Sequence, residues 1–475
     1  MKLTDQHGIE RNTHEEMEKV LLQHFQKIAE ETSEDRYQFM QKFTQYIPTL
    51  VTKEDNFNLN RPVTEEEIEE AVKEMQNGKA PGSDGFNVDF FKACWRIVKQ
   101  DTLEVVEDSR RFKKVLKALN ESFIALIPKQ EKATSPDRFR PIALCNVIYK
   151  IISKVIANRL KPLLPTLVSE EQMGYVEGRQ ILDNIIQAHE TIHSLITNKK
   201  VGMIMQLDIA KAYDKVSWLY IISILKSYAF YHNWIKWIMV LVTTTSCSIL
   251  LNGAPSKNFK ISRGLKQGDP LSPFLFILMM EGLGRAMKAA KEEGRIYGLR
   301  LTHGGDTVTH QQFVDDTMFQ GTPIVKEAKA FKQILSEFSR VAGTKVSLTK
   351  SNIFVFNTDI SIQINLSRIL GFQRESLPVK YLGVPLTDKP LHKDIWEPVL
   401  NKLKDKINKW TNIALNLAGR LVLTVAILQS IPIYMLYPIP APASAMTNIR
   451  NIQRDFLWGK SEEKKKWALV AWDRV

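Results

Sequence analysis

The sequence predicts an α+β fold, in which a domain of mixed helices and strands is followed by a separate helical module. Three patterns carry this prediction. An apolar run at 203–207 predicts a buried strand, turn-centred strand patterns at 248–262 and 308–319 predict two hairpins, and an apolar stretch at 273–287 predicts a long helix between them. We therefore expect packed helices to cover one face of a sheet.

The N-terminal third is expected to be mostly helical. Residues 1–60 are polar and mixed, with a helical stretch near 15–28, and function is expected downstream of them. Thr64 followed by Glu67 is a capping-box signature at the start of a helix that Gly78 can close. A helical pattern at 148–164 then carries basic residues that could follow phosphates or could simply be solvated.

Three aspartates are the candidates for chemistry. Asp208 ends the apolar strand, while Asp315 and Asp316 are expected to form the turn of the second hairpin. Two carboxylates about 4 Å apart repel by roughly 4 kcal/mol at an effective dielectric near 20, so three converging acids suggest a bound cation. Oxygen ligands without nearby His or Cys favour Mg²⁺ or Mn²⁺. Because an isolated Asp-Asp pair in a hairpin is usually only a turn, the surrounding motifs decide the interpretation.

Beyond residue 389 the apolar residues are spaced for one face of a helix. The aromatic members, Trp396, Trp410 and Trp458, are predicted to be core residues, and the interspersed lysines to lie outside. The apolar run at 421–435 is interrupted by polar residues and proline and falls short of the roughly 20 residues of a membrane span. We expect it to be a buried helix.

Composition narrows the class of partner. Lys and Arg total 65 against 52 Asp and Glu, and the resulting net charge of +13 favours a polyanion such as nucleic acid. The three cysteines, Cys94, Cys145 and Cys247, form no C-x-x-C pair, so neither a disulfide framework nor a zinc ribbon is indicated. The first residues lack the apolar core of a signal peptide, and secretion is not expected.

Three segments together resemble the palm motifs of reverse transcriptases: Gln206–Val216, Arg263–Pro273 and Phe313–Asp316. Further blocks in the same order resemble the non-LTR retrotransposon branch, especially LINE-type elements of plants. These blocks are Ala80–Gly85, Ile127–Lys129, Phe139–Ile142, Gly178–Asn184, Lys350–Ser351 and Tyr381–Leu386. The resemblance covers roughly residues 60–460.

The resemblance implies a right-hand polymerase fold with fingers, a palm made of an antiparallel sheet plus helices, and a helical thumb. It implies an N-terminal helical and polar segment at 1–60, an extension of the fingers at 61–125, fingers and palm at 126–388, and a thumb-like region at 389–475. Similar full-length elements also carry an endonuclease, so the chain is expected to be a fragment of a longer reading frame or a degenerate copy.

The resemblance also implies roles for individual residues. Asp208, Asp315 and Asp316 would be catalytic and would hold two Mg²⁺ (or Mn²⁺) ions. The residues implied in dNTP binding are Lys129, Arg140, Tyr213, Gln267, Gly268 and Lys350, with Tyr213 as the gate that excludes a ribose 2′-hydroxyl. The residues expected to contact nucleic acid are Lys150, Lys154, Arg159, Lys380, Lys402 and Lys406. Asp214 is left outside the catalytic set as a possible cap of the following helix.

The implied partners are an RNA template, a DNA primer or target and dNTPs, with no membrane. A nuclear site of action is implied by the family only, because the basic run at 464–466 is too short to be a signal. Two other readings stay open. The same fold could be an inactive nucleic-acid-binding remnant or a maturase-like protein. Less favoured is a zinc metalloprotease, because His189, Glu190 and His193 fit H-E-x-x-H while Ile185, Ile186, Ile192 and Ile196 mark that helix's apolar face.

Overall fold

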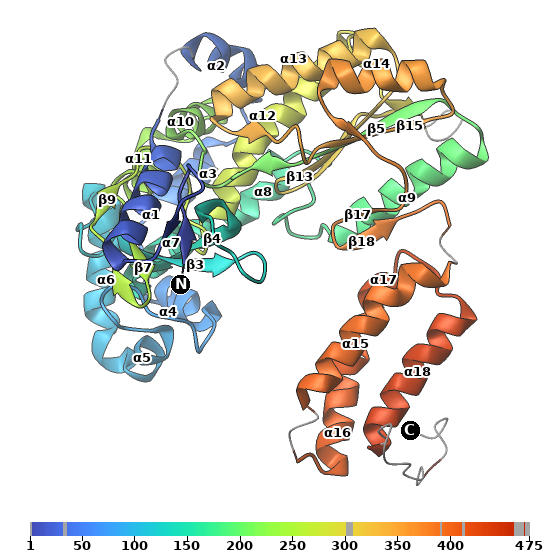
Figure 1. Ribbon diagram of the computed structural model, residues 1–475. Helices are drawn as coiled ribbons and strands as arrows, with labels where there is room; N and C mark the ends of the chain where they lie inside the picture. The colour runs from blue at the N-terminus through green and yellow to red at the C-terminus, as the bar shows by residue number, and fades with distance from the viewer. Residues whose placement is uncertain are drawn as a thin grey trace. The chain divides into compact units, whose positions relative to one another are not determined.

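The computed structural model describes residues 2–31, 36–300, 307–389, 392–410, 414–459 and 470, so the basic run at 464–466 lies outside the described residues. The chain forms two compact units (Figure 1). Unit 1 comprises residues 1–179 and 202–374, and unit 2 comprises residues 180–201 and 375–475. A helix from the middle of the sequence therefore belongs to the same unit as the C-terminal region. The expected boundaries at residues 60, 125 and 388 stay predictions.

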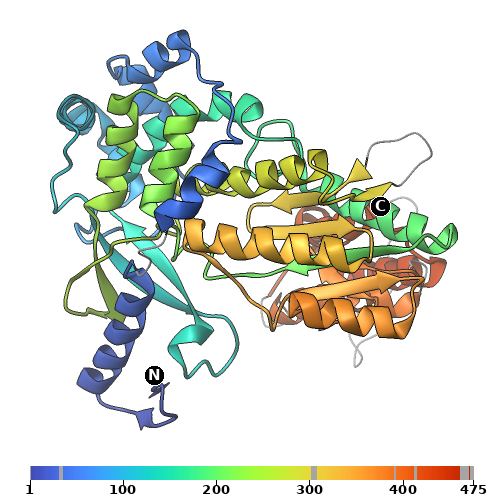
Figure 2. The ribbon, with the colours of Figure 1, turned by 90° about the horizontal axis from the view of Figure 1, so that it is seen from above.

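The first sheet of unit 1 has the strand order β12-β13-β5-β15-β16, in which only the β15–β16 pair is parallel. Its strands are β5 (Gly202–Leu207), β12 (His310–Phe313), β13 (Asp316–Gly321), β15 (Asn352–Phe356) and β16 (Gln373–Arg374). The helices α12 (Ser272–Glu292) and α13 (Val325–Ala342) lie side by side along it (Figure 2). Phe319 of β13 stacks on Phe331 of α13 with ring centroids 5.3 Å apart, so the helices bury one sheet face.

A second sheet in unit 1 is built from β3, β4 and β7–β9. Its strands are β3 (Glu121–Pro128), β4 (Phe139–Cys145), β7 (Ser246–Leu251), β8 (Ala254–Pro255) and β9 (Phe259–Lys260). Strand β3 pairs antiparallel with β4 and parallel with β7, which pairs antiparallel with β8 and β9. The N-terminal helix α1 (His14–Ala29) packs on this sheet, because Leu21 and Phe25 share an apolar cluster with Cys247 and Phe259.

The remaining helices of unit 1 pack around the two sheets. They are α2 (Arg36–Thr44), α3 (Lys53–Asn60), α4 (Glu65–Glu74), α5 (Val88–Ala93), α6 (Trp95–Phe112), α7 (Val147–Leu160), α8 (Leu164–Leu167), α10 (Trp218–Ser227), α11 (His232–Thr243) and α14 (Ile360–Leu370). Short strands complete the unit: β1 (Leu3–Thr4), β2 (Glu10–Arg11), β6 (Ile209–Ala210), β10 (Leu299–Arg300), β11 (Thr307–Val308) and β14 (Lys345–Val346). The α+β prediction and the Thr64/Glu67 capping box are confirmed.

The second hairpin differs from the expectation by one residue. Phe313 pairs directly with Asp316, which leaves Val314 and Asp315 as a two-residue turn. The expected Asp315–Asp316 turn is therefore wrong, and Asp316 is the first residue of β13. The preference of Asp for turns predicted a turn at Asp315 and Asp316. The pairing of β13 with β5 sets the actual register, which places Asp316 in the strand.

Unit 2 contains α9 (Ile181–Thr197), β17 (Val379–Tyr381), β18 (Val384–Leu386), α15 (Glu397–Trp410), α16 (Leu417–Leu423), α17 (Ser430–Leu436) and α18 (Ala443–Trp458). Trp396 belongs to the apolar cluster of unit 2, Trp410 packs against that cluster and Trp458 is buried, which confirms that these aromatics are core residues. On α9, Ile185 and Ile192 are buried as expected. Ile186 and Ile196 are each 39% exposed, so their assignment to the apolar face is wrong.

The expectation of a buried helix at 421–435 is also wrong. The helical stretch Leu417–Leu436 is only 22% buried over its most apolar window. Leu428 and Met435 face the core of unit 2, while Val422, Val425 and Ile433 are exposed. Among the described residues this is the one helix long and apolar enough to cross a membrane, and a single such helix is weak support for a membrane span.

Candidate active site

The first sheet brings the three predicted aspartates to one edge. Asp208 directly follows β5, and its backbone is fixed on both sides: its N–H donates to Ser351 Oγ at 3.1 Å, and its carbonyl accepts from the Ser347 N–H at 2.8 Å. Thr317 of β13 pairs with Leu207 of β5. The tip of the β12–β13 hairpin, with Asp315 and Asp316, therefore lies beside Asp208.

The charges of the three carboxylates act on one another. Burial, followed by the charge of Asp208, raises the pKa of Asp315. Burial, followed by the charges of Asp315 and Asp208, raises the pKa of Asp316 to about 6. Within the described ranges no group of three Asp, Glu, His or Cys side chains lies close enough together to hold a metal ion, so the three aspartates do not form a metal site by themselves in this arrangement. The oxygen-only donors and their mutual repulsion fit Mg²⁺, which usually keeps several waters and takes further ligands from substrate phosphates.

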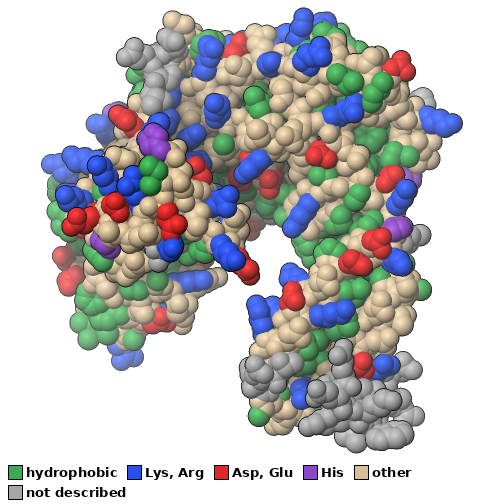
Figure 3. Space-filling view, viewed as in Figure 1, with side chains coloured by type: hydrophobic (Ala, Val, Ile, Leu, Met, Phe, Trp, Pro, Cys, Tyr) green, Lys and Arg blue, Asp and Glu red, His purple; other side chains and the backbone are tan. Residues whose placement is uncertain are grey.

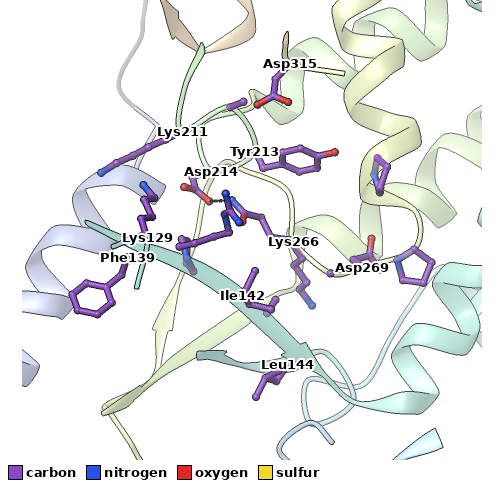
Figure 4. A pocket seen from close by; sticks show the side chains of 18 of the residues that line it. Lys129, Phe139, Ile142, Leu144, Lys211, Tyr213, Asp214, Lys266, Asp269 and Asp315 are labelled. Carbon is purple, nitrogen blue, oxygen red and sulfur yellow. Dashed lines mark hydrogen bonds between the residues drawn. The ribbon is translucent and has the colours of Figure 1, made fainter. Parts of the chain in front are cut away.

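A cavity of about 1300 Å³ in unit 1 opens in front of this edge. Asp208 and Asp315 line it, whereas Asp316 is not among its lining residues. All six residues implied in dNTP binding also line it: Lys129, Arg140, Tyr213, Gln267, Gly268 and Lys350. Figure 4 shows Asp315, Tyr213 and Lys129 around the same space, each from a different element. The fold thus gathers side chains that are up to 221 positions apart in the sequence, from 129 to 350.

Four cations crowd one wall of this cavity. The pKa of Lys129 is lowered by burial and then by the charges of Lys350, Lys211 and Arg140. The Lys129 ammonium donates to the Asp137 carbonyl at 3.0 Å. The Asp137 carboxylate, which pairs with Lys211 at 2.6 Å, offsets only part of this positive charge, and Arg and Lys are the usual ligands of phosphate. The wall is therefore suited to a polyphosphate.

Tyr213 and Gly268 both line the cavity, and the conformation of each is fixed by its surroundings or its backbone. The Tyr213 ring stacks on Phe276 with centroids 4.7 Å apart and an interplanar angle of 9°, which fixes its orientation. Burial, and then the neighbouring Tyr175, raise the pKa of the Tyr213 hydroxyl. Gly268 has φ +104, a conformation that L side chains rarely adopt. A bulkier residue at 268 would strain the backbone that borders the cavity.

Asp214 also lines the cavity and does not cap a helix. The side chain that caps α10 belongs to Ser217, which accepts from the Tyr220 N–H. The Asp214 carboxylate accepts instead from Gln267 Nε2 at 3.4 Å, and burial raises its pKa to about 6. The suggestion that Asp214 caps the following helix is wrong, because the helix starts three residues later than that assignment required.

Sequence reasoning missed the contribution of the N-terminal helix. His24 of α1 lines the cavity, and its Nε2 lies 3.0 Å from the Lys211 ammonium. Burial, followed by the charge of Lys211, lowers the pKa of His24 to about 4, so the neutral ring accepts this hydrogen bond. Lys211 also pairs with Asp137 at 2.6 Å. Lys211 lies within the motif at 206–216, whereas no local pattern marks His24.

The residues expected to contact nucleic acid have different surroundings. Lys150 and Lys154 of α7 line the cavity, with Lys154 paired to Glu74 at 2.6 Å. The Arg159 side chain is 5% exposed, is paired with Glu67 at 2.8 Å and donates to three backbone carbonyls. The N–H groups of its guanidinium therefore form hydrogen bonds within the protein.

In unit 2, the other three of these residues, Lys380 of β17 and Lys402 and Lys406 of α15, are exposed. Figure 3 shows basic side chains over the helices of unit 2.

The H-E-x-x-H stretch does not form a zinc site in the described part of the chain. His189 is turned toward the backbone of Pro385, and burial lowers its pKa. His193 is exposed and lies 3.3 Å from Thr197 Oγ1. No group of three possible metal ligands surrounds either ring among the described residues. Nothing in this geometry supports the metalloprotease reading.

Comparisons with known proteins match the sequence of this chain to a family. Residues 127–386, more than half of the chain, match the family described as "Reverse transcriptase (RNA-dependent DNA polymerase)". The Transposon TX1 uncharacterized 149 kDa protein of Xenopus laevis is 24% identical over 416 residues, which are 86% of this chain and 31% of that protein.

Two further relatives extend the comparison. The Pol polyprotein from type-1 retrotransposable element R2 of Popillia japonica is 25% identical over 330 residues, which are 69% of this chain and 44% of that protein. An uncharacterized mitochondrial protein of Arabidopsis thaliana is 47% identical over 68 residues, which are 14% of this chain and 56% of that protein. The chain therefore spans less than half the length of the two retroelement proteins.

Proposed function

Because this chain belongs to the reverse transcriptase family, we propose that it is the RNA-directed DNA polymerase of a non-LTR retrotransposon. It extends a primer 3′-hydroxyl with dNTPs on an RNA template. Its retroelement relatives, named for transposon TX1 and element R2, support this assignment. A nuclear site of action follows from the proposed retroelement function.

One observation carries the proposal: a single cavity has carboxylates at one end and a wall of cations near them. The carboxylates of Asp208 and Asp315 indicate a site for divalent cations. The cationic side chains of Lys129, Arg140 and Lys350 indicate a site for the triphosphate of a nucleotide. Phosphoryl transfer depends mainly on positioning and charge neutralisation. Carboxylates held at strand ends meet that need better than carboxylates on mobile loops.

In this proposal the sheet edge with Asp208, Asp315 and Asp316 is the palm, β3 and β4 belong to the fingers, and the helices after residue 389 form the thumb. The three aspartates would hold two Mg²⁺ or Mn²⁺ ions, which would supply the charge that neutralises the triphosphate and activates the primer hydroxyl. Lys129 and Arg140 orient the triphosphate. Tyr213 lies under the incoming sugar and excludes a 2′-hydroxyl.

The remaining candidates fit around this centre. Gln267 and Gly268 border the templating base pair, and Lys350 lies next to the leaving phosphates. Lys150 and Lys154 contact nucleic acid near the cavity, while Lys380, Lys402 and Lys406 supply exposed charge for a duplex in unit 2. Arg159 is omitted from this set because its guanidinium group is already bonded within the protein.

Primer extension on an RNA template with Mg²⁺ and dNTPs tests the proposal. The wild-type chain extends the primer, and Asp208→Asn lowers the rate by a factor of about 10³ or more, because positioned charge supplies much of the rate enhancement. Asp101→Asn, which changes an exposed carboxylate on α6, retains the wild-type rate. Salt-sensitive RNA binding by a wild-type chain that extends no primer would instead identify a nucleic-acid-binding remnant.

A further inference from the structure

A buried glutamine outside the metal-binding set holds the turn that carries Asp315. Gln172 lies in the segment between α8 and α9, is 1% exposed and belongs to unit 1. Its Oε1 accepts from the Val314 N–H at 2.8 Å, and its Nε2 donates to the Val314 carbonyl at 3.3 Å. One side-chain amide therefore bonds to both polar backbone groups of the residue that precedes Asp315.

The backbone around Gln172 adds further bonds to the same hairpin. The Gln312 N–H donates to the Glu171 carbonyl at 2.7 Å, and the Met173 N–H donates to the Gln312 carbonyl at 2.9 Å. Gln172 Oε1 also accepts from the Gly174 N–H at 3.0 Å, which fixes the orientation of the amide. Strand β12 thus has a short parallel neighbour on its outer edge, through Gln172 and Gln312.

The conformation of Val314 explains why the turn needs the two hydrogen bonds from Gln172. Val314 has φ +59, in the left-handed region that β-branched residues rarely occupy. Strained backbone of this kind persists only where the surroundings determine it strongly. Without the two bonds from Gln172, the turn can relax toward other conformations, and the next residue in the chain is Asp315.

The close packing at Gly174 supports the same reading. A Cβ atom on residue 174 would lie 2.5 Å from Val314 Cγ2 and 3.0 Å from the Val314 nitrogen. The segment therefore approaches the hairpin turn as closely as the backbone allows. Such an approach brings Gln172 within reach of both groups of Val314.

We propose that Gln172 is a positioning residue for polymerisation, which holds the Val314–Asp315 turn so that the Asp315 carboxylate meets the divalent cation. This inference rests on the proposed function. Gln172 does not line the cavity, so it acts through the backbone of the turn. Groups that orient metal ligands typically change metal affinity or activity about 10–100-fold when removed.

The test compares Gln172→Met with a matched control, Gln320→Met. Gln320 is also fully buried and lies in β13 of the same hairpin, four residues beyond Asp316, where its side-chain amide donates to Gln311 Oε1. Mn²⁺ affinity is measured from the free-ion EPR signal without primer or dNTP. The kcat and the KM for dNTP are measured by primer extension, and melting is measured in EDTA.

Gln172→Met is expected to weaken Mn²⁺ binding and lower kcat by about tenfold or more each, with KM for dNTP changed by less than about threefold. Gln320→Met is expected to lower the melting temperature similarly but to keep Mn²⁺ affinity within about threefold of the wild type. Should Gln172→Met not fold, Gln172→Asn replaces it, since the shorter amide cannot bond both groups of Val314.

Three results would overturn the inference. Gln172 variants with wild-type Mn²⁺ affinity and kcat would show that the hydrogen bonds from Gln172 to Val314 do not position Asp315. An equal loss of Mn²⁺ binding in Gln320→Met would reduce the effect to general destabilisation. A wild-type chain that neither binds Mn²⁺ nor extends a primer would overturn the proposed function as well. In the first two cases, a wild-type chain that is active and an Asp208→Asn variant that is inactive would leave the proposed function intact.

Discussion

Replacing Asp214 with asparagine should stabilise the protein at neutral pH. Burial raises the Asp214 pKa from its ordinary value of 3.8 to about 6. Because the folded-state pKa is the higher one, the group's stabilising contribution is complete below about pH 3.8 and is lost as the pH rises through about 6. A shift of about two pKa units corresponds to about 3 kcal/mol. This value is an upper limit, since the side chain is partly exposed.

Urea unfolding followed by circular dichroism measures the effect. At pH 7.5, Asp214→Asn should raise the free energy of unfolding of unit 1 by up to about 3 kcal/mol, and at pH 4 the gain should shrink to less than about 1 kcal/mol. The control is Asp269→Asn. Its carboxylate accepts from Ser153 Oγ, the Ser272 N–H and Ser272 Oγ, so this substitution should destabilise. An Asp214→Asn protein that is no more stable than wild type at pH 7.5, or equally stabilised at both pH values, would refute the reasoning.

Three other substitutions test separate parts of the site. In the proposed function the Tyr213 ring takes the space of a ribose 2′-hydroxyl, so Tyr213→Ala should raise ribonucleotide incorporation relative to dNTP incorporation by about tenfold or more. Unchanged selectivity in single-nucleotide extension would contradict this role of Tyr213. Ser351→Ala leaves the Asp208 N–H unpaired, so unfolding free energy should fall by about 1–3 kcal/mol in denaturant titrations and kcat should fall with it. Arg159→Met should lower the free energy of unfolding by about 3 kcal/mol in the same titrations. It should leave the salt dependence of RNA binding unchanged, whereas Lys150→Met should change it. The same change in both variants would show that Arg159 contacts nucleic acid.

Local patterns predicted the elements that position the site. The apolar run that stops at Asp208 is β5, and the alternating stretch around Asp315 is the β12–β13 hairpin. The capping box at Thr64 formed as expected. These features depend on neighbouring residues in the sequence, so periodicity and turn chemistry are enough to find them.

Other parts of the site depend on contacts between distant residues. The register of β13 against β5 decided which residues form the turn, and a one-residue shift is not visible in turn propensity. Gln172 and Ser351 act on backbone groups more than 140 positions away, at Val314 and Asp208. A polar residue in a loop carries no sequence signal for such a partner. The exposed face of 417–436 was missed because composition cannot say which side of a helix is covered.

The position of α1 decides how this protein can be shortened for experiments. His24 and Phe25 form part of the wall beside Lys211 and Asp137. The same helix covers the apolar surface of Cys247 and Phe259. A recombinant chain trimmed to residues 127–386 would thus lose part of the cavity wall and would expose this apolar surface to water. Poor solubility or weak nucleotide binding by such a trimmed protein would reflect the missing helix and would not count against the proposed roles of the three aspartates.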